Sequence, residues 1–282
     1  MYRTGHFTAN DGVKLFFRAW IPQEPKGFLI LIHGAGEHSG RYAHIGETCM
    51  KENIGIIAPD LRGFGKSGGP RGHVNHFSDY IDDLEILINL FKKRYESAPL
   101  FIFGHSLGGL IAIRYGQLCP HKANGFILSS PALGIRIQLP MLLKKVLQFC
   151  SRVTPNLAVE PFKWMGRLKK IRTFNHLIPE PDKNIIQDPL FTLQYTPRWL
   201  MELIQNGISA LLETPKFRFP FLCLYDQQDP IIHPDSISSF LNSVSTEDKK
   251  FVMFEEGLHR HWNINQCDNA LENVLTWINP RL

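Results

Sequence analysis

The sequence has few cysteines, a small net charge and no long apolar run, and each of these features excludes a class of protein. Its five cysteines are widely spaced and never form a C-x-x-C pair, which argues against a disulfide framework or a zinc cluster. The N-terminus lacks the apolar core of a signal peptide, and no apolar stretch approaches the about 18 residues of a membrane span. The formal net charge is only +5, so composition indicates no nucleic-acid partner. We therefore expect a cytoplasmic protein.

Apolar side chains, in contrast, are plentiful. Of the 282 residues, 44% are apolar and 11% are aromatic, which excludes a mainly disordered, collagenous or coiled-coil chain. The length would suit roughly two domains of about 150 residues, but α/β folds of this size often form one domain. Whether the chain forms one domain or two therefore depends on the order of its predicted strands and helices.

Short apolar runs alternate with helical patterns along most of the chain. Two β-rich runs near the N-terminus flank Asn10-Asp11-Gly12, which is a strong hairpin signal. The runs typical of strands buried on both faces are Phe28 to Ile32, Ile54 to Ala58, Leu100 to Phe103, Gly125 to Leu128, Phe221 to Leu224 and Phe251 to Phe254. Helical spacing is found in Asp79 to Tyr95 (behind a candidate cap at Ser78), Leu107 to Leu118 and Asp268 to Asn279. This alternation predicts an α/β fold with a mostly parallel central sheet and helices on both faces.

One region interrupts the alternation. Between about residues 133 and 215, helical stretches are separated by prolines and no buried strand is evident. Because the strand pattern resumes at Phe221, we expect a helical cap inserted into one domain. The expected division is core 1–132, cap 133–216 and core 217–282.

The clearest chemical signal is the pentapeptide Gly104-His105-Ser106-Leu107-Gly108. It follows a buried run directly and leads directly into a helical pattern. That context describes a nucleophile elbow, a strained turn that projects a serine hydroxyl from the end of the sheet. The helix N-terminus behind it offers backbone N–H groups to an oxyanion. We predict Ser106 as the nucleophile.

A serine hydroxyl needs a base to take its proton and a carboxylate to orient that base. In this architecture the partners follow in the chain order Ser, Asp, His. Asp229 lies a few positions past the run that begins at Phe221, and we predict it as the orienting acid, with Asp226 capping the turn. We predict His259 as the base, with His261 and His233 as competitors.

A second backbone donor for the oxyanion should come from the loop after an early strand. The run Phe28 to Ile32 leads into a glycine-containing loop, His33-Gly34-Ala35-Gly36. We predict that the oxyanion hole is made by the N–H groups of Ala35 and Leu107.

The chain also carries longer motifs: His33 to Tyr42, Asp60 to Ser67, Gly104 to Gly109, Asp229, and Gly257-Leu258-His259. In these it resembles the monoacylglycerol lipase group of α/β-hydrolases, with lysophospholipases as near relatives. The resemblance spans almost the whole chain, and the segment from His33 to Tyr42 points to glyceride substrates. Within the second motif we interpret Arg62 to Ser67 as a structural turn, because it matches no phosphate loop.

The resemblance implies a serine carboxylic ester hydrolase, cytosolic or peripherally attached to membranes, that cleaves monoacylglycerols through an acyl-enzyme without metal or organic cofactor. It implies an apolar tunnel in the cap for one acyl chain, and head-group contacts from Glu37, Arg41 and His261. The chain departs from the family in that His261 lies two residues after His259, where a spacing of three is expected. It departs again at Ile185, where a cap tyrosine is expected.

Alternatives stay open for the substrate and the cap. Lysophospholipase activity is the nearest alternative, and a short-chain esterase, an aminopeptidase or a non-catalytic binding protein are further ones. The basic, partly apolar stretch from Arg136 to Arg172 fits either contact with an anionic membrane surface or a solvated helix face. The apolar side chains of Leu142, Leu143, Val146, Leu147 and Phe149 fit either packing against the sheet or lining of an acyl-chain site.

Overall fold

A computed structural model describes residues 1–119, 122–136, 141–158, 187–256, 259–262 and 267–282. Several sequence predictions fall outside these residues. They concern Ile185, Gly257, Leu258, the side chain of Leu143 and the basic residues between Lys163 and Arg172.

The described strands form one sheet of eight in the order β1-β2-β4-β3-β5-β6-β7-β8. All pairs from β4 to β8 are parallel, while β1 and β2 form an antiparallel hairpin at one edge. Both the hairpin and the mostly parallel sheet expected from the sequence are therefore confirmed. The strands are β1 Tyr2–Thr8, β2 Lys14–Trp20, β3 Gly27–Ile32, β4 Ile54–Pro59, β5 Leu100–His105, β6 Gly125–Ser129, β7 Phe221–Asp226 and β8 Lys249–Phe254.

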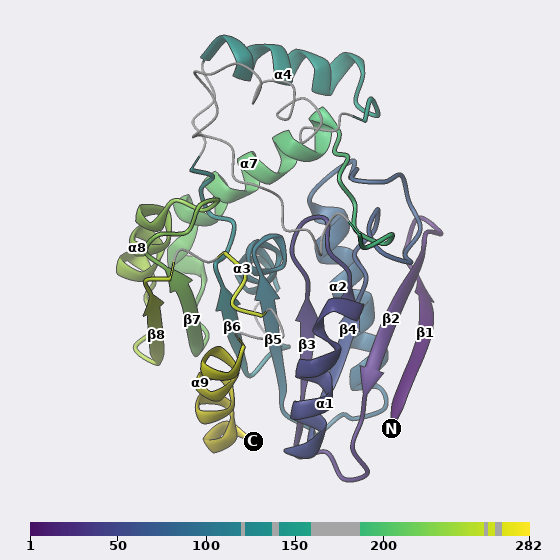
Figure 1. Ribbon diagram of the computed structural model, residues 1–282, viewed down its shortest axis with the longest axis vertical. Coiled ribbons are helices and arrows are strands. Elements are labelled where there is room, and N and C mark those ends of the chain that lie inside the picture. Colours follow the sequence, from purple (N-terminus) through teal and green to yellow (C-terminus); the bar gives the residue numbers. More distant parts are fainter. Residues whose placement is uncertain (120–121, 137–140, 159–186, 257–258, 263–266) are drawn as a thin grey trace.

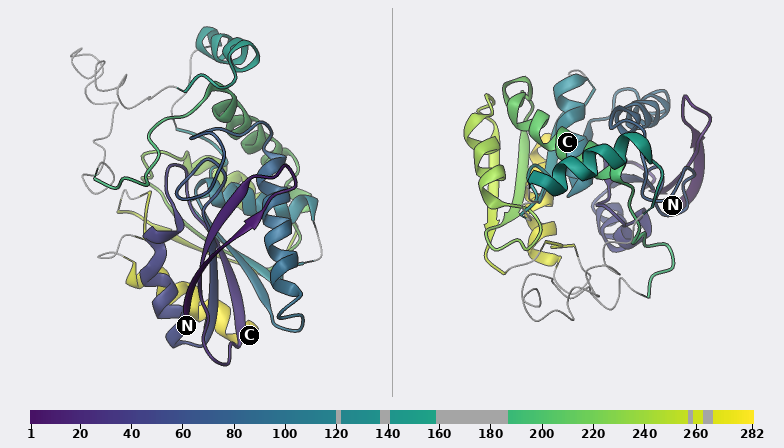
Figure 2. Two further views of the ribbon diagram at one scale, coloured as in Figure 1. Left: turned by 90° about the vertical axis from the view of Figure 1, so that its right-hand side faces the viewer. Right: turned by 90° about the horizontal axis from the view of Figure 1, so that it is seen from above.

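Helices cover both faces of the sheet. One apolar cluster joins the sheet to α2, α3 and α8, and a second joins the opposite face to α1 and α9; Figure 2 shows α1 and α2 on opposite sides. The described helices are α1 Ala43–Lys51, α2 Ser78–Lys92, α3 Leu107–Leu118, α4 Met141–Val153, α7 Pro197–Leu212, α8 Pro234–Ser243 and α9 Asp268–Ile278, with 3₁₀ turns at Ser39–Tyr42, Thr214–Lys216 and Asn279–Arg281.

The prediction that Ser78 is the N-cap residue of α2 is wrong. The residue that precedes α2 is Phe77, and no side chain caps this helix end. Instead the backbone N–H of Phe77 donates to Glu202 Oε2 of α7 at 2.8 Å. A partner distant in sequence therefore accepts the backbone N–H at the start of α2.

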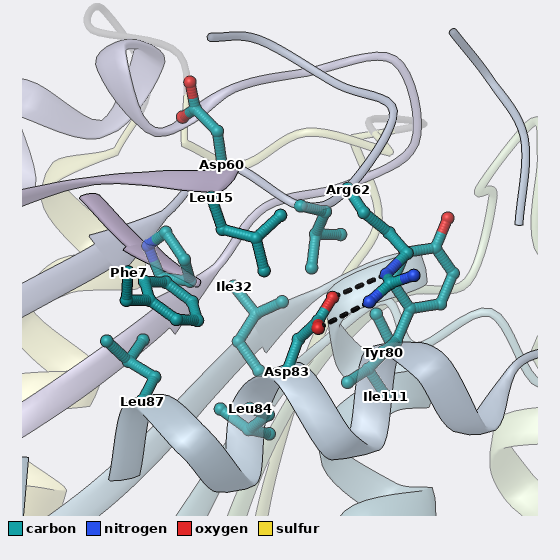
Figure 3. A pocket seen from close by; sticks show the side chains of 12 residues that line it. Phe7, Leu15, Ile32, Asp60, Arg62, Tyr80, Asp83, Leu84, Leu87 and Ile111 are labelled. Carbon is teal, nitrogen blue, oxygen red and sulfur yellow. Dashed lines mark hydrogen bonds and ion pairs between the residues drawn. The ribbon is translucent and has the colours of Figure 1, made fainter. Parts of the chain in front are cut away.

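The loop after β4 is attached to α2 by Arg62. Its Nε and Nη2 donate to the two carboxylate oxygens of Asp83, each at 2.7 Å (Figure 3), and its Nη1 donates to Asp11 at 2.8 Å. The cavity beside this ion pair measures only ≈ 10 Å³, about the room of one water molecule. These contacts agree with the structural interpretation of the turn that begins at Arg62.

Helices α4 and α7 lie above the carboxyl ends of the parallel strands (Figure 1). They occur in the chain between β6 and β7. The expected interruption of the strand pattern therefore corresponds to helices at the end of the sheet where α/β folds carry their sites.

Candidate active site

Ser106 occupies a strained turn between β5 and α3. Its backbone has φ 51° and ψ −112°, in the left-handed half of φ space that side chains disfavour. The turn is possible because its neighbours are glycines: a Cβ on Gly104 would lie 2.2 Å from the carbonyl oxygen of Gly108, and one on Gly108 would lie 2.1 Å from that of Ile32. The glycines of the motif are thus required by close backbone approach.

A chain of hydrogen bonds runs from Asp229 through His259 to Ser106. Nδ1 of His259 donates to Asp229 Oδ2 at 2.7 Å, and Nε2 accepts from Ser106 Oγ at 3.0 Å. The Ser106 and His259 residues are each 7% exposed, so the hydroxyl can be reached while most of the base is shielded. The structure brings these side chains, which come from loops after β5, β7 and β8, together in the arrangement of a nucleophile, a base and an orienting acid.

The environment of Asp229 keeps it ionised. Burial alone would raise its pKa, but the hydrogen bond and charge of His259, together with the N–H groups of Ile232 and Ile231, hold that pKa below its ordinary value. Those two N–H groups donate to Oδ1 at 2.9 and 2.7 Å. By contrast Asp226 accepts from the N–H of Gln228 at 2.7 Å, as the expected turn cap would.

The orientation of the loop after β3 is determined by His33. Its Nε2 accepts the N–H of Leu61 at 2.9 Å, so the proton is on Nδ1, which donates to the carbonyl oxygen of Gly34 at 2.7 Å. In a trans peptide the N–H points opposite to the carbonyl. The N–H of Ala35 therefore points away from His33.

The two expected oxyanion donors lie on segments that pack against each other. A Cβ on Gly34 would lie 3.3 Å from the Cβ of Ser106, which places this loop beside the elbow. Leu107 is the first residue of α3, so its N–H has no partner within the helix. In the part of the chain that the structure describes, no protein acceptor takes the N–H of Ala35 or Leu107.

Glu37 is buried at the centre of a network behind that loop. The residue is 2% exposed, and its Oε2 accepts from the N–H of Gly34 at 3.0 Å and from the Tyr42 hydroxyl at 2.6 Å. Its Oε1 accepts from Arg260 Nε at 2.7 Å. Burial opposes ionisation, but the charge of Arg260 and the hydrogen bond from Tyr42 hold the pKa of Glu37 well below its ordinary value.

This environment differs from the expected head-group contact. Both carboxylate oxygens of Glu37 are engaged by protein donors, so the side chain holds the loop after β3 in place. Sequence reasoning missed Arg260, because an arginine beside a predicted base has no local pattern that reveals a partner 223 positions away.

Arg41 links Glu37 to the segment after residue 187, because its Nε lies 3.8 Å from Glu37 Oε1. Its Nη1 lies 3.4 Å from Asp188 Oδ2, which also accepts from His38 Nε2 at 2.9 Å. The N–H of Thr192 donates to the carbonyl oxygen of Gly36 at 2.8 Å. Arg41 is thus paired with a carboxylate at the rim of the site.

The structure does not bring His261 to these groups. Its ring stacks on Phe254 at 4.3 Å between centroids, and its Nε2 lies 3.9 Å from Asp226. Among the described residues it forms no hydrogen bond or ion pair with Glu37 or Arg41. The adjacent Trp262 donates from Nε1 to Ser129 Oγ at 2.7 Å and so anchors the loop that carries His259.

Three of the apolar residues of helix α4 differ from both expectations, while Leu147 is half-buried. Leu142, Val146 and Phe149 are 75%, 48% and 65% exposed, so they pack neither against the sheet nor around an enclosed site. Met141 and Val153 are 69% and 61% exposed on the same helix. No described helix is both long and apolar enough to span a bilayer, and the described residues contain no group of three metal-ligating side chains.

Comparison with known proteins gives consistent matches. A family described as serine aminopeptidase, S33, matches residues 23–263. Phospholipase YtpA of Bacillus subtilis is 30% identical over 86% of this chain and 92% of its own. Human monoglyceride lipase is 28% identical over 98% of this chain and 90% of its own. The crystal structure of a monoacylglycerol lipase from Paleococcus ferrophilus superposes with a TM-score of 0.78 at 27% identity, covering 94% of this chain and 98% of that one.

Proposed function

Since the chain belongs to the serine aminopeptidase S33 family, we propose that it is a serine hydrolase that cleaves monoacylglycerols to fatty acid and glycerol. Its fold is that of the α/β-hydrolases, and its relatives make it an ester hydrolase that acts on lipids. The observation that carries the serine mechanism is the hydrogen-bonded chain Asp229, His259, Ser106. Relatives named as monoglyceride and monoacylglycerol lipases favour monoacylglycerol as the substrate.

The mechanism follows from that chain. His259 Nε2 takes the hydroxyl proton as Ser106 Oγ attacks the ester carbonyl, and Asp229 stabilises the imidazolium that forms. The N–H groups of Ala35 and Leu107 bind the oxyanion. His259 then returns its proton to the glycerol oxygen as the ester C–O bond breaks, which leaves an acyl group on Ser106. A water molecule, deprotonated by His259, releases the fatty acid and restores the serine.

We include in the proposal a cap formed by residues 133–216 that contacts lipid surfaces through α4. Leu142, Val146, Phe149 and Val153 recur at helical spacing, and they form an exposed apolar stripe. Lys145 and Arg152 on the same helix are exposed and basic. An apolar stripe flanked by cations suits the interface of an anionic membrane.

Vesicle binding tests this part of the proposal. Wild type should sediment with vesicles that contain anionic lipid, and Phe149→Ser should bind several-fold more weakly because one apolar anchor is lost. Leu90→Ser, a comparable change at a residue that is 49% exposed on α2, should bind like wild type. Equal loss in both variants would contradict the assignment to α4.

A second candidate is hydrolysis of phospholipids or lysophospholipids. The relative from Bacillus subtilis is named a phospholipase. The exposed Lys145 and Arg152 provide cations for a phosphorylated head group. This candidate shares the catalytic residues with the first and differs only in the leaving group.

A substrate panel separates the candidates. It contains a long-chain monoacylglycerol, a lysophosphatidylcholine of the same acyl length, a p-nitrophenyl butyrate and an aminoacyl p-nitroanilide. We expect the highest kcat/KM for the monoacylglycerol and no turnover of any ester by Ser106→Ala. Preference for the lysophospholipid would replace the first candidate by the second, and preference for the anilide would indicate a peptidase.

The controls address the nucleophile itself. A fluorophosphonate probe should label wild type and should leave Ser106→Ala unlabelled, while thermal unfolding should show that this variant is folded. Full ester hydrolysis by Ser106→Ala would overturn the mechanism.

A further inference from the structure

Strand β8 forms an exposed apolar edge of the sheet. Among the described strands it is the outermost, and β7 is the one strand paired with it. Phe251 and Met253 are 56% and 45% exposed on it. An edge strand with exposed apolar side chains is a template for pairing with another strand.

The hydrogen bonds to β7 show which backbone groups face outward. The carbonyl oxygens of Asp248 and Phe254 accept from Phe221 and Gln227, so the even-numbered residues of β8 bond to the sheet. The odd-numbered residues, Phe251 and Met253, therefore direct their N–H and C=O groups outward. Within the described residues none of these groups has a partner.

We propose that β8 pairs antiparallel with β8 of a second copy of this chain, so that the two sheets become continuous across a two-fold axis. In an antiparallel ladder the outward-facing residues must oppose one another. The pairing that satisfies this condition with like side chains sets Phe251 opposite Met253 of the partner copy. Val252 then lies opposite its own copy on the axis, and Lys249 lies opposite Glu255.

The sequence of the edge is what selects a second copy as the occupant. In this register apolar side chains meet apolar ones, and each Lys249, whose ammonium also donates to the carbonyl oxygens of Leu241 and Val244 at 3.1 and 3.3 Å, lies opposite an exposed acidic Glu255. A shift of the register by two residues in one direction would set Phe251 opposite Phe251 of the partner copy and Lys249 opposite Met253. A shift by two residues in the other direction would set Phe251 opposite Glu255. The strand is thus self-complementary in one register, as an interface with two-fold symmetry requires.

The pairing has a consequence for the active sites. The carboxyl ends of the paired strands point in opposite directions, and helices α4 and α7 lie above the carboxyl end in each copy (Figure 1). The two sites of the dimer therefore open on opposite sides, and neither blocks the other. Pairing through β8 and hydrolysis are independent, so the proposal does not depend on the substrate.

Measurement of mass in solution tests the proposal. Wild type should show twice the monomer mass of 32.3 kDa, decreasing towards the monomer on dilution. Met253→Lys and Phe251→Lys should be monomeric at concentrations where wild type is dimeric, and both should keep wild-type turnover of p-nitrophenyl butyrate, which shows that they fold. Phe149→Lys, a matched change on α4, should stay dimeric.

Disulfide trapping tests the register. In Val252→Cys the introduced cysteines of the two copies lie directly opposite each other at the two-fold axis. They form a non-hydrogen-bonded pair with Cα atoms about 4.5 Å apart, a distance that a disulfide can span. This variant should form a covalent dimer under mild oxidation. Lys250→Cys, on the same face of β8, should not form a covalent dimer. In this register residue 250 of each copy lies opposite Phe254 of the other copy, so the two introduced thiols are too far apart to bond. Wild type, with its five free cysteines, gives the background.

Three results would overturn the proposal. The first is a wild-type chain that is monomeric at every concentration. The second is a dimer that Phe149→Lys dissociates and Met253→Lys does not, which would assign the interface to α4. The third is covalent dimer from Lys250→Cys but none from Val252→Cys, which would exclude this register.

Discussion

Replacing Glu37 by glutamine separates a positioning role from a head-group contact. The carboxylate accepts hydrogen bonds from Gly34, Tyr42 and Arg260. A glutamine has one accepting oxygen and one donating amide. If the glutamine oxygen keeps the hydrogen bonds from Gly34 and Tyr42, its amide group faces the side-chain Nε–H of Arg260. A donor then faces a donor. If the amide is reversed, the loop after β3 loses the acceptor for the N–H of Gly34.

The size of the effect follows from what is lost. A hydrogen bond to a charged group contributes about 1.5–3 kcal/mol, and removal of one partner of a fully buried ion pair costs about 3–5 kcal/mol. The Arg260 side chain is 23% exposed, so water compensates part of its lost partner. We expect Glu37→Gln to lower the free energy of unfolding by about 2–4 kcal/mol. At about 2–4 °C per kcal/mol, the melting temperature should fall by roughly 4–16 °C.

The effect on activity should be the same for every ester. Loss of one oxyanion donor costs about 10²–10³ in kcat, and a displaced Ala35 N–H loses part of that, so we expect about a 10- to 100-fold decrease. The oxyanion is common to monoacylglycerol, lysophosphatidylcholine and p-nitrophenyl butyrate, and the decrease should therefore appear equally in all of them.

The assay is kcat and KM on those esters, together with thermal unfolding. Glu213→Gln is the matched control, because Glu213 accepts from Arg114 at 2.9 Å but is 32% exposed and lies at the end of α7. It should change stability by at most about 1 kcal/mol. A Glu37→Gln variant that loses monoacylglycerol hydrolysis alone, through KM and with unchanged stability, would refute the positioning role and restore the glycerol contact.

Three further predictions concern the triad, the elbow and the acid range. Asp229→Asn should lower kcat by about 10⁴, because the amide favours the wrong tautomer of His259; a loss below 10-fold on p-nitrophenyl butyrate would contradict the assigned acid. Gly108→Ala should be destabilised by at least about 1–3 kcal/mol in urea unfolding, since its Cβ would lie 2.1 Å from the oxygen of Ile32; wild-type stability would show that the elbow is not close-packed. Glu37, Asp188 and Asp229 all have folded-state pKa values below their ordinary ones. As pH falls, the unfolded chain therefore binds protons first, so their stabilisation is complete above about pH 5 and is lost progressively below about pH 4; a urea midpoint that is the same at pH 6 and pH 3 would contradict this.

Much of the fold could be predicted because its signals are local. The buried strands of a parallel sheet are continuous apolar runs, and the run at Phe28 to Ile32 became β3 within one residue of its expected bounds. The helix Leu107–Leu118 has the expected bounds. The contact at the start of α2 could not be predicted, because the group that accepts the N–H of Phe77 comes from Glu202, which only the folded chain brings near.

The candidate site divides in the same way. The sequence by itself determined which runs form the buried strands and which loops carry Ser106, Asp229 and His259, because parallel strands place their carboxyl ends, and the residues just after them, at one edge of the sheet. The order of the strands in the sheet came from the structure. Only the tertiary structure decided that Arg260 rather than His261 contacts Glu37, and that Phe149 faces outward. The physical reason is that side-chain direction in a loop, and the face that a helix leaves unpacked, depend on neighbours that are distant in the sequence.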